Sequence, residues 1–103
     1  MRELTTETFD GAIKSKTPVL IEFWAVWCMP CKIFAPVLEQ LSDELGGNAE
    51  ICKVNIDDYQ DLAVANGIEV IPTVILFKDG KELDRAAGIL QKDDIIKMIE
   101  AHI

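Results

Sequence analysis

A chain of 103 residues, half of them hydrophobic, can bury one apolar core, so we expect a single domain over residues 1–103. Its 18 acidic and 10 basic residues give a net charge of −8, which would repel nucleic acids and anionic membranes. Residues 1–7 lack the basic and apolar segments of a signal peptide, and no apolar run is long enough to span a membrane. We therefore expect a cytoplasmic protein.

The N-terminal half of the chain predicts two helices and one long strand. A weakly amphipathic segment near residues 9–14 predicts the first helix, and residues 2–4 are compatible with a short strand before it. Residues 19–24 form an apolar, partly β-branched run that is typical of a strand buried on both faces. Apolar residues recur at helical spacing over residues 32–45, and Pro36 is expected to kink this second helix.

The middle of the chain predicts a strand and a short helix. Gly46 and Gly47 are expected to end the long helix in a left-handed conformation. Residues 51–56 predict a second long strand. Asp57 or Asp58 is then expected to cap a short helix that ends at residue 65.

The C-terminal part predicts a hairpin and a last helix. Residues 73–77 and 81–87 predict two strands joined by a turn at Asp79-Gly80. Asp93 and Asp94 favour the start of a helix, which is expected to turn inward the four residues Ile95, Ile96, Ile99 and Ile103. The order α-β-α-β-α-β-β-α predicts an α/β fold, with a partly parallel sheet that has helices on both faces and an antiparallel hairpin at one edge.

Two cysteines, Cys28 and Cys31, follow the first long strand and open the long helix. The free N–H groups and partial positive charge of a helix's first turn stabilise a thiolate, so Cys28 is expected to be the exposed, reactive thiol. Pro30 suits the first turn because its missing N–H would have no partner there. Side chains three residues apart on a helix are close enough for a disulfide. Cys31 is expected to face inward and to react less readily.

A lone C-x-x-C pair in a reducing compartment is either a redox pair or half of a metal site. Tetrahedral zinc needs four ligands, and only Cys52 and His102 remain as candidates, without paired spacing. Cys52 is expected to lie in the core as a small apolar residue. The pattern therefore favours redox use and no bound metal.

The chain resembles the thioredoxin family along essentially its whole length. The resemblance is carried in order by Phe23-Trp24-Ala25-Val26-Trp27-Cys28-Met29-Pro30-Cys31-Lys32, Asn55-Ile56-Asp57, Ile71-Pro72-Thr73, Phe77-Lys78-Asp79-Gly80 and Gly88. It implies a thioredoxin fold: a central mixed sheet of four or five strands, with a parallel core and an antiparallel C-terminal hairpin, flanked by four helices.

The resemblance also implies roles for the residues of the site. Cys28 would be the attacking thiolate and Cys31 the resolving thiol of a redox-active disulfide. Glu22 would be the buried acid that accepts or donates the proton of Cys31, and Lys53 would modulate it. An apolar surface would dock an extended substrate segment, and this surface comprises Trp27, Met29, Pro30, Ile71, Pro72 and Gly88. The peptide bond before Pro72 would be cis.

The activity implied is the reduction of protein disulfides through a mixed disulfide. Disulfide-bearing proteins would be the substrates and a thioredoxin reductase the electron donor, with no bound cofactor and a monomeric chain. Three residues depart from the family pattern, because Glu22 replaces an Asp, and Met29 and Val70 each replace a Gly. A disulfide isomerase or oxidase is the enzymatic alternative, although isomerases carry His where this chain has Pro30. A redox-sensing binding module is the non-enzymatic alternative.

Overall fold

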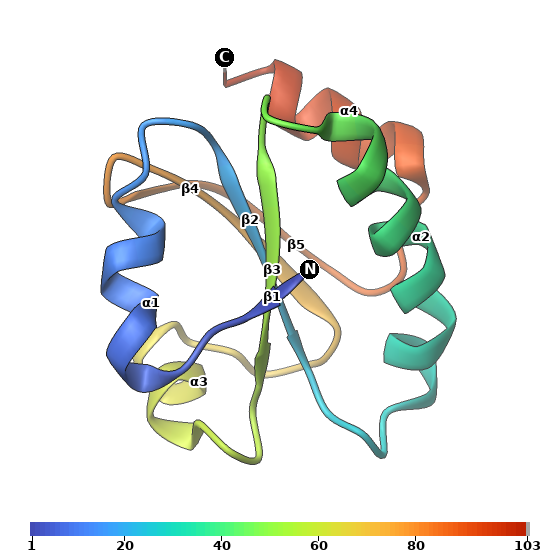
Figure 1. Cartoon of the computed structure of the whole chain (residues 1–103). Coiled ribbons are helices and arrows are strands. Elements are labelled where there is room, and N and C mark those ends of the chain that lie inside the picture. The colour runs from blue at the N-terminus through green and yellow to red at the C-terminus, as the bar shows by residue number, and fades with distance from the viewer. Residues whose placement is uncertain (103) are drawn as a thin grey trace.

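The computed structural model describes residues 1–102 (Figure 1). Its elements, in chain order, are β1 (Arg2–Glu3), α1 (Thr6–Ile13), β2 (Val19–Trp24), α2 (Met29–Leu45), β3 (Glu50–Asn55), α3 (Gln60–Ala65), β4 (Thr73–Lys78), β5 (Lys81–Ala87) and α4 (Lys92–Glu100). The predicted succession of helices and strands is confirmed, including the short strand at the N-terminus. Within residues 1–102, no helix is both long enough and apolar enough to cross a membrane.

The five strands form one mixed sheet in the order β1-β3-β2-β4-β5. Strands β1, β3 and β2 run parallel, whereas β4 pairs antiparallel with β2 and with β5. The predicted parallel core and antiparallel hairpin are both confirmed. The hairpin turns at Asp79 and Gly80, whose φ angles of 54° and 80° are the positive values that a tight β-hairpin turn requires.

The alternation of side chains along β2 divides the core between the two faces of the sheet. Val19, Ile21 and Phe23 belong to an apolar cluster that also contains buried residues of α1 and α3. Leu20 belongs to a second cluster, with buried residues of α2 and α4. Figure 1 shows the same layers, with α1 and α3 on one side of the sheet and α2 and α4 on the other. Because Glu22 is two residues after Leu20, it lies on the α2 side.

Several helix ends differ from the sequence predictions. Helix α2 begins at Met29, three residues before the apolar spacing indicates. Gly46 has a positive φ of 56°, but its ψ of −124° is not the left-handed helical conformation expected. The N-cap of α3 is Tyr59, whose side chain makes no capping bond, so the expected cap at Asp57 or Asp58 is wrong.

The last helix agrees with the prediction in its buried face. Ile95 and Ile99 are buried and Ile96 is half-buried, whereas Ile103 lies outside the described residues. The backbone N–H of Gln91 donates to Asp94 Oδ2 at 3.2 Å, so a first-turn acid does stabilise the helix start.

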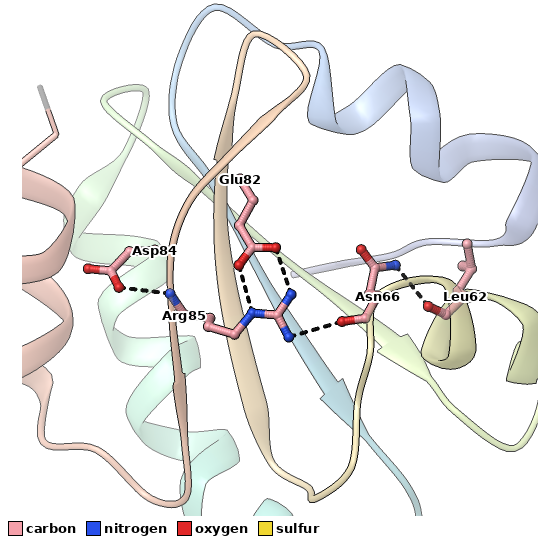
Figure 2. Close-up of polar contacts among 5 residues, drawn as sticks. All are labelled: Leu62, Asn66, Glu82, Asp84 and Arg85. Carbon is pink, nitrogen blue, oxygen red and sulfur yellow. Dashed lines mark hydrogen bonds and ion pairs between the residues drawn. The ribbon is translucent and has the colours of Figure 1, made fainter.

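A polar network holds the connection between α3 and β4 against β5 (Figure 2). Arg85 donates from Nε and Nη2 to the two carboxylate oxygens of Glu82, each at 2.6 Å, and from Nη1 to the carbonyl oxygen of Asn66 at 2.9 Å. The side-chain amide of Asn66 donates to the carbonyl oxygen of Leu62 in α3 at 2.8 Å. The fork of Arg85 therefore ties β5 to the end of α3, just before the segment that leads to Pro72.

The packing of α2 on the sheet can be tested at Leu38, which is fully buried in the α2 side of the core. Leu38→Ala should lower the free energy of unfolding by about 2–5 kcal/mol, because it leaves a cavity against β2 and β4. Urea denaturation of the disulfide form measures this change. Glu39→Ala, on the exposed face of the same helix, should change it by no more than about 0.5 kcal/mol. Equal effects of the two substitutions would contradict the assigned face of α2.

Candidate active site

The cysteine pair lies where β2 passes into α2. Cys28 has an extended backbone and is the N-cap of α2, with Pro30 in the first turn. The two cysteines are joined by a disulfide, with their Cα atoms 5.3 Å apart. The backbone N–H of Cys31 points at Cys28 Sγ, with a nitrogen–sulfur distance of 3.2 Å. The sulfur of Cys28 therefore sits at the positive end of the helix, as the sequence predicts.

The two cysteines do not differ in exposure. Cys28 is 4% exposed and Cys31 is 3% exposed, so the expectation that Cys28 alone faces solvent is wrong for the disulfide form. Both pack in a small cluster with Ala25, against the half-buried side chains of Trp24 and Ile71. In this form accessibility does not distinguish the two sulfurs, whereas their position relative to the helix terminus does.

A loop before β4 lies directly against the disulfide. The Ile71–Pro72 peptide bond is cis, as the resemblance implies. The carbonyl oxygen of Ile71 lies 3.8 Å from Cys28 Sγ. Gly88 donates its backbone N–H to the carbonyl oxygen of Pro72 at 2.8 Å, which brings the end of β5 to the same place. Thr73 Oγ1 donates to the carbonyl oxygen of Val70 at 2.7 Å and fixes the loop from the other side.

The side chains around the disulfide are largely apolar and exposed. Trp27 is 65% exposed and Met29 62%, while Pro30 and Gly88 are also exposed. Ile71 is half-buried and Pro72 is buried, so these two shape the surface from below. Three further exposed apolar residues next to these positions in the sequence were not predicted as part of the surface. Val26 precedes Trp27 and is 57% exposed, Ile89 follows Gly88 and is 49% exposed, and Val70 precedes Ile71 and is 57% exposed. Their apolar character next to turn residues was the available signal.

The indole of Trp27 is held in place by a residue from another connection. Its Nε1–H donates to Asp57 Oδ2 at 2.8 Å, and the backbone N–H of Asp57 donates to Asn55 Oδ1 at 2.9 Å. The carboxylate expected to cap α3 therefore orients an exposed tryptophan instead. This contact joins residues 30 positions apart, which local sequence patterns do not reveal.

Glu22 lies beneath the cysteines on the α2 face of the sheet and is only 2% exposed. Burial raises the pKa of its carboxyl group from 4.5 to about 7, and the positive charge of Lys53 opposes this shift. Within residues 1–102, Glu22 Oε2 and Trp24 Nε1 are buried polar atoms without a hydrogen-bond partner. Both residues line a cavity of about 80 Å³ that is also lined by Cys31 and Lys53. A cavity of that size has room for water, which needs only about 10–15 Å³ of such space.

Lys53 is the neighbour of Glu22 on β3. Its ammonium lies 4.7 Å from the centre of the Trp24 ring, a cation–π contact. No ion pair within 4.0 Å joins Lys53 to Glu22 in the part of the chain that the structure describes. The lysine therefore acts on the Glu22 carboxyl through its field, while its own charge is held by the indole.

The third cysteine is not part of the disulfide. Cys52 is fully buried on β3, and burial raises the pKa of its thiol to about 11. Residues 1–102 contain no group of three or more His, Cys, Asp or Glu side chains placed to hold a metal ion.

Two cysteines at a helix terminus, with an exposed apolar surface around them, provide what thiol–disulfide exchange requires. One sulfur lies where a helix terminus would stabilise a thiolate, the second is bonded to it, and a carboxyl group with a pKa of about 7 lines the same cavity as the second. The fold and the site together define a thiol–disulfide oxidoreductase.

Comparison with known proteins gives the family. The family model for thioredoxin matches residues 1–101. A thioredoxin of Chlamydia caviae is 46% identical over 99% of this chain and 98% of its own length, and one of Rickettsia bellii is 39% identical over 97% and 96%. A chloroplastic M-type thioredoxin of Zea mays is 40% identical over 94% of this chain and 59% of its own length. The chain belongs to the thioredoxin family.

Membership and site together establish the reaction. The protein is a protein-disulfide reductase that uses a redox-active Cys-x-x-Cys dithiol and passes through a mixed disulfide. Its substrates are proteins that carry disulfides.

The raised pKa of Glu22 predicts how stability depends on pH. The folded state holds the Glu22 proton up to about pH 7, whereas the unfolded state loses it near pH 4.5. The contribution of the neutral Glu22 carboxyl group to the free energy of unfolding is therefore complete below pH 4.5, and it is lost as the pH rises to about 7. Glu22→Gln, which cannot ionise, should exceed the wild type in unfolding free energy by about 2–4 kcal/mol at pH 8 and by little at pH 4.5.

Urea denaturation of both proteins in the disulfide form, at the two pH values, measures the difference. Glu39→Gln is the control, because Glu39 is an exposed acid on α2 and should show no such dependence. A gap between Glu22→Gln and wild type that stays constant with pH would contradict the raised pKa.

Proposed function

We propose that Cys28 is the attacking thiolate, that Cys31 is the resolving thiol, and that Glu22 receives the proton of Cys31 through water. The contact between the backbone N–H of Cys31 and Cys28 Sγ, at 3.2 Å, carries the first assignment. A thiolate at that position accepts a charge-assisted hydrogen bond from the first turn of α2. The sulfur of Cys31 has no comparable donor among the bonds of residues 1–102.

The reaction then proceeds in two exchanges. The Cys28 thiolate attacks one sulfur of the substrate disulfide, so the bond between the substrate sulfurs breaks and one of them leaves as a thiolate. The mixed disulfide forms at Cys28. Cys31 loses its proton and attacks Cys28 Sγ, which closes the Cys28–Cys31 disulfide and releases the second substrate sulfur. The substrate gains two electrons and the cysteine pair loses them.

Glu22 is suited to the proton step by its position and by its pKa. It lines the same cavity as Cys31, and its unpartnered Oε2 can accept a hydrogen bond from water in that cavity. The unpartnered Nε1–H of Trp24 can donate to the same water. A group with a pKa of about 7 is ionised often enough to take a proton at neutral pH and returns it readily. Lys53 adjusts this balance through its charge.

The apolar surface docks the substrate. Trp27 and Met29 flank the attacking sulfur from the α2 side, while Ile71 and Gly88 flank it from the sheet. Because Asp57 fixes the Trp27 indole, part of the surface is organised before a substrate arrives. Pro30 and the buried Pro72 complete this surface.

The direction of transfer that we propose is reduction, with a thioredoxin reductase supplying electrons to the Cys28–Cys31 disulfide. Pro30 supports this direction. A histidine at this position could add a positive charge that stabilises the dithiol and makes the disulfide more oxidising, and Pro30 adds none. The equilibrium of the cysteine pair with glutathione measures which direction of transfer is favoured.

We also propose that residues 1–103 form one domain that works as a cytoplasmic monomer without a bound cofactor. The negative charge and the full-length bacterial relatives support this assignment.

The roles of the two cysteines are tested by trapping. Cys31→Ser should still carry out the first exchange but not the second, because a serine hydroxyl does not displace a thiol from sulfur. Incubated with insulin, the variant should accumulate covalent adducts that dithiothreitol dissolves, seen on non-reducing gels and by mass spectrometry. Cys28→Ser is the matched control, since it also keeps one site cysteine and Cys52.

The control should form at least about tenfold fewer adducts, because Cys31 lacks the stabilisation of the helix terminus. Equal trapping by the two variants would show that the roles are wrongly assigned. No trapping by either, with no catalysis of insulin reduction by the wild type, would indicate a binding module instead.

A further inference from the structure

The sulfur atoms of this chain differ sharply in exposure. The chain has three cysteines and three methionines, all within residues 1–102. In the oxidised protein Cys28 and Cys31 are joined to each other, and Cys52 is fully buried. Met1 and Met98 are half-buried, whereas Met29 is 62% exposed. An oxidant that meets the disulfide form therefore finds Met29 as the accessible, unprotected sulfur.

Met29 belongs to the docking surface proposed above and is next to Cys28 in the sequence. It is the first residue of α2 and stands between the attacking cysteine and Pro30. Trp27, on the other side of Cys28, is equally exposed. A substrate segment that brings a disulfide to Cys28 Sγ must therefore cover the Met29 side chain.

We propose that Met29 is a site of reversible oxidation to methionine sulfoxide, through which hydroperoxides weaken the docking of substrate proteins. The proposal rests on the proposed function, because it needs Cys28 as the attacking sulfur. The Met29 thioether attacks the terminal oxygen of the peroxide, so a sulfur–oxygen bond forms and the oxygen–oxygen bond breaks. Methionine sulfur loses two electrons, and hydrogen peroxide is reduced to water. A methionine sulfoxide reductase restores the thioether.

The expected effect follows from the polarity of the product. The sulfoxide oxygen is a strong hydrogen-bond acceptor, and covering it with an apolar substrate segment removes its water without supplying a donor. The second-order rate constant for reduction of insulin should fall about 5- to 30-fold. A small disulfide such as 5,5′-dithiobis(2-nitrobenzoate) covers little of the surface, so its rate constant should change by less than about twofold.

The experiment begins with the disulfide form, in which the site cysteines are protected. The protein is treated with hydrogen peroxide, the excess is removed with catalase, and tryptic peptides are analysed by mass spectrometry. The remaining protein is reduced with dithiothreitol, freed of it, and mixed with insulin or with the small disulfide. Samples with insulin are quenched with iodoacetamide and the alkylated insulin chains are quantified by mass spectrometry, whereas reduction of the small disulfide is followed by the absorbance of the thiolate that it releases. Met29 should gain one oxygen before Met1 and Met98 do, and only the insulin rate should fall.

Two variants separate the role of Met29 from general damage. Met29→Leu has no sulfur at this position, so its insulin rate, whatever its starting value, should not change on treatment. Met98 is a half-buried residue of α4, far from Met29 in the sequence, so Met98→Leu should respond as the wild type does. Earlier oxidation of Met1 or Met98, or an unchanged insulin rate in protein oxidised at Met29, would overturn the proposal. If untreated protein reduces no insulin, the proposed function fails, and the order of oxidation still decides whether Met29 is the reactive sulfur.

Discussion

The hydrogen bond from the Cys31 backbone to Cys28 Sγ ties the chemistry of this protein to the fold. It exists because β2 ends at Trp24 and the chain makes one turn before α2 begins at Met29, which leaves Cys28 as the N-cap. The direction of α2 is fixed in turn by the packing of Phe34 and Leu38 on the sheet. The positive end of the helix therefore points at one sulfur, and the loop before β4 that contains the cis bond lies against the same atom.

The same architecture accounts for the unusual position of Glu22. Alternation along β2 puts Glu22 on the face that α2 covers, where an apolar residue would stabilise the core more. Burial without a partner for Oε2 makes the ionised carboxylate costly, and this cost is what moves its pKa to the neutral range. The site thus gives up stability above pH 7 to keep in the cavity beside Cys31 the carboxyl group that we propose as proton acceptor. Lys53 and the cavity limit the cost by providing a field and access to water.

The sequence predicted the features that depend on local patterns. The strands over β2 and β4, the turn at Asp79-Gly80 and the helix-terminal position of Cys28 follow from periodicity and turn chemistry. The contacts that organise the proposed docking surface could not be predicted in this way. Trp27 meets Asp57, and Arg85 meets Asn66, across connections that only the folded chain brings together. The near burial of Cys28 was missed for the same reason, because Ile71 covers it from a loop 43 residues away.

The central claim is that the helix terminus, and not exposure, makes Cys28 the reactive sulfur. Limiting iodoacetamide added to the fully reduced protein at neutral pH, followed by peptide mapping, tests it directly. The account predicts that Cys28 is alkylated well before Cys31 and Cys52, although Cys28 and Cys31 are almost equally buried. Alkylation of Cys28 and Cys31 at similar rates, or of Cys52 first, would contradict it.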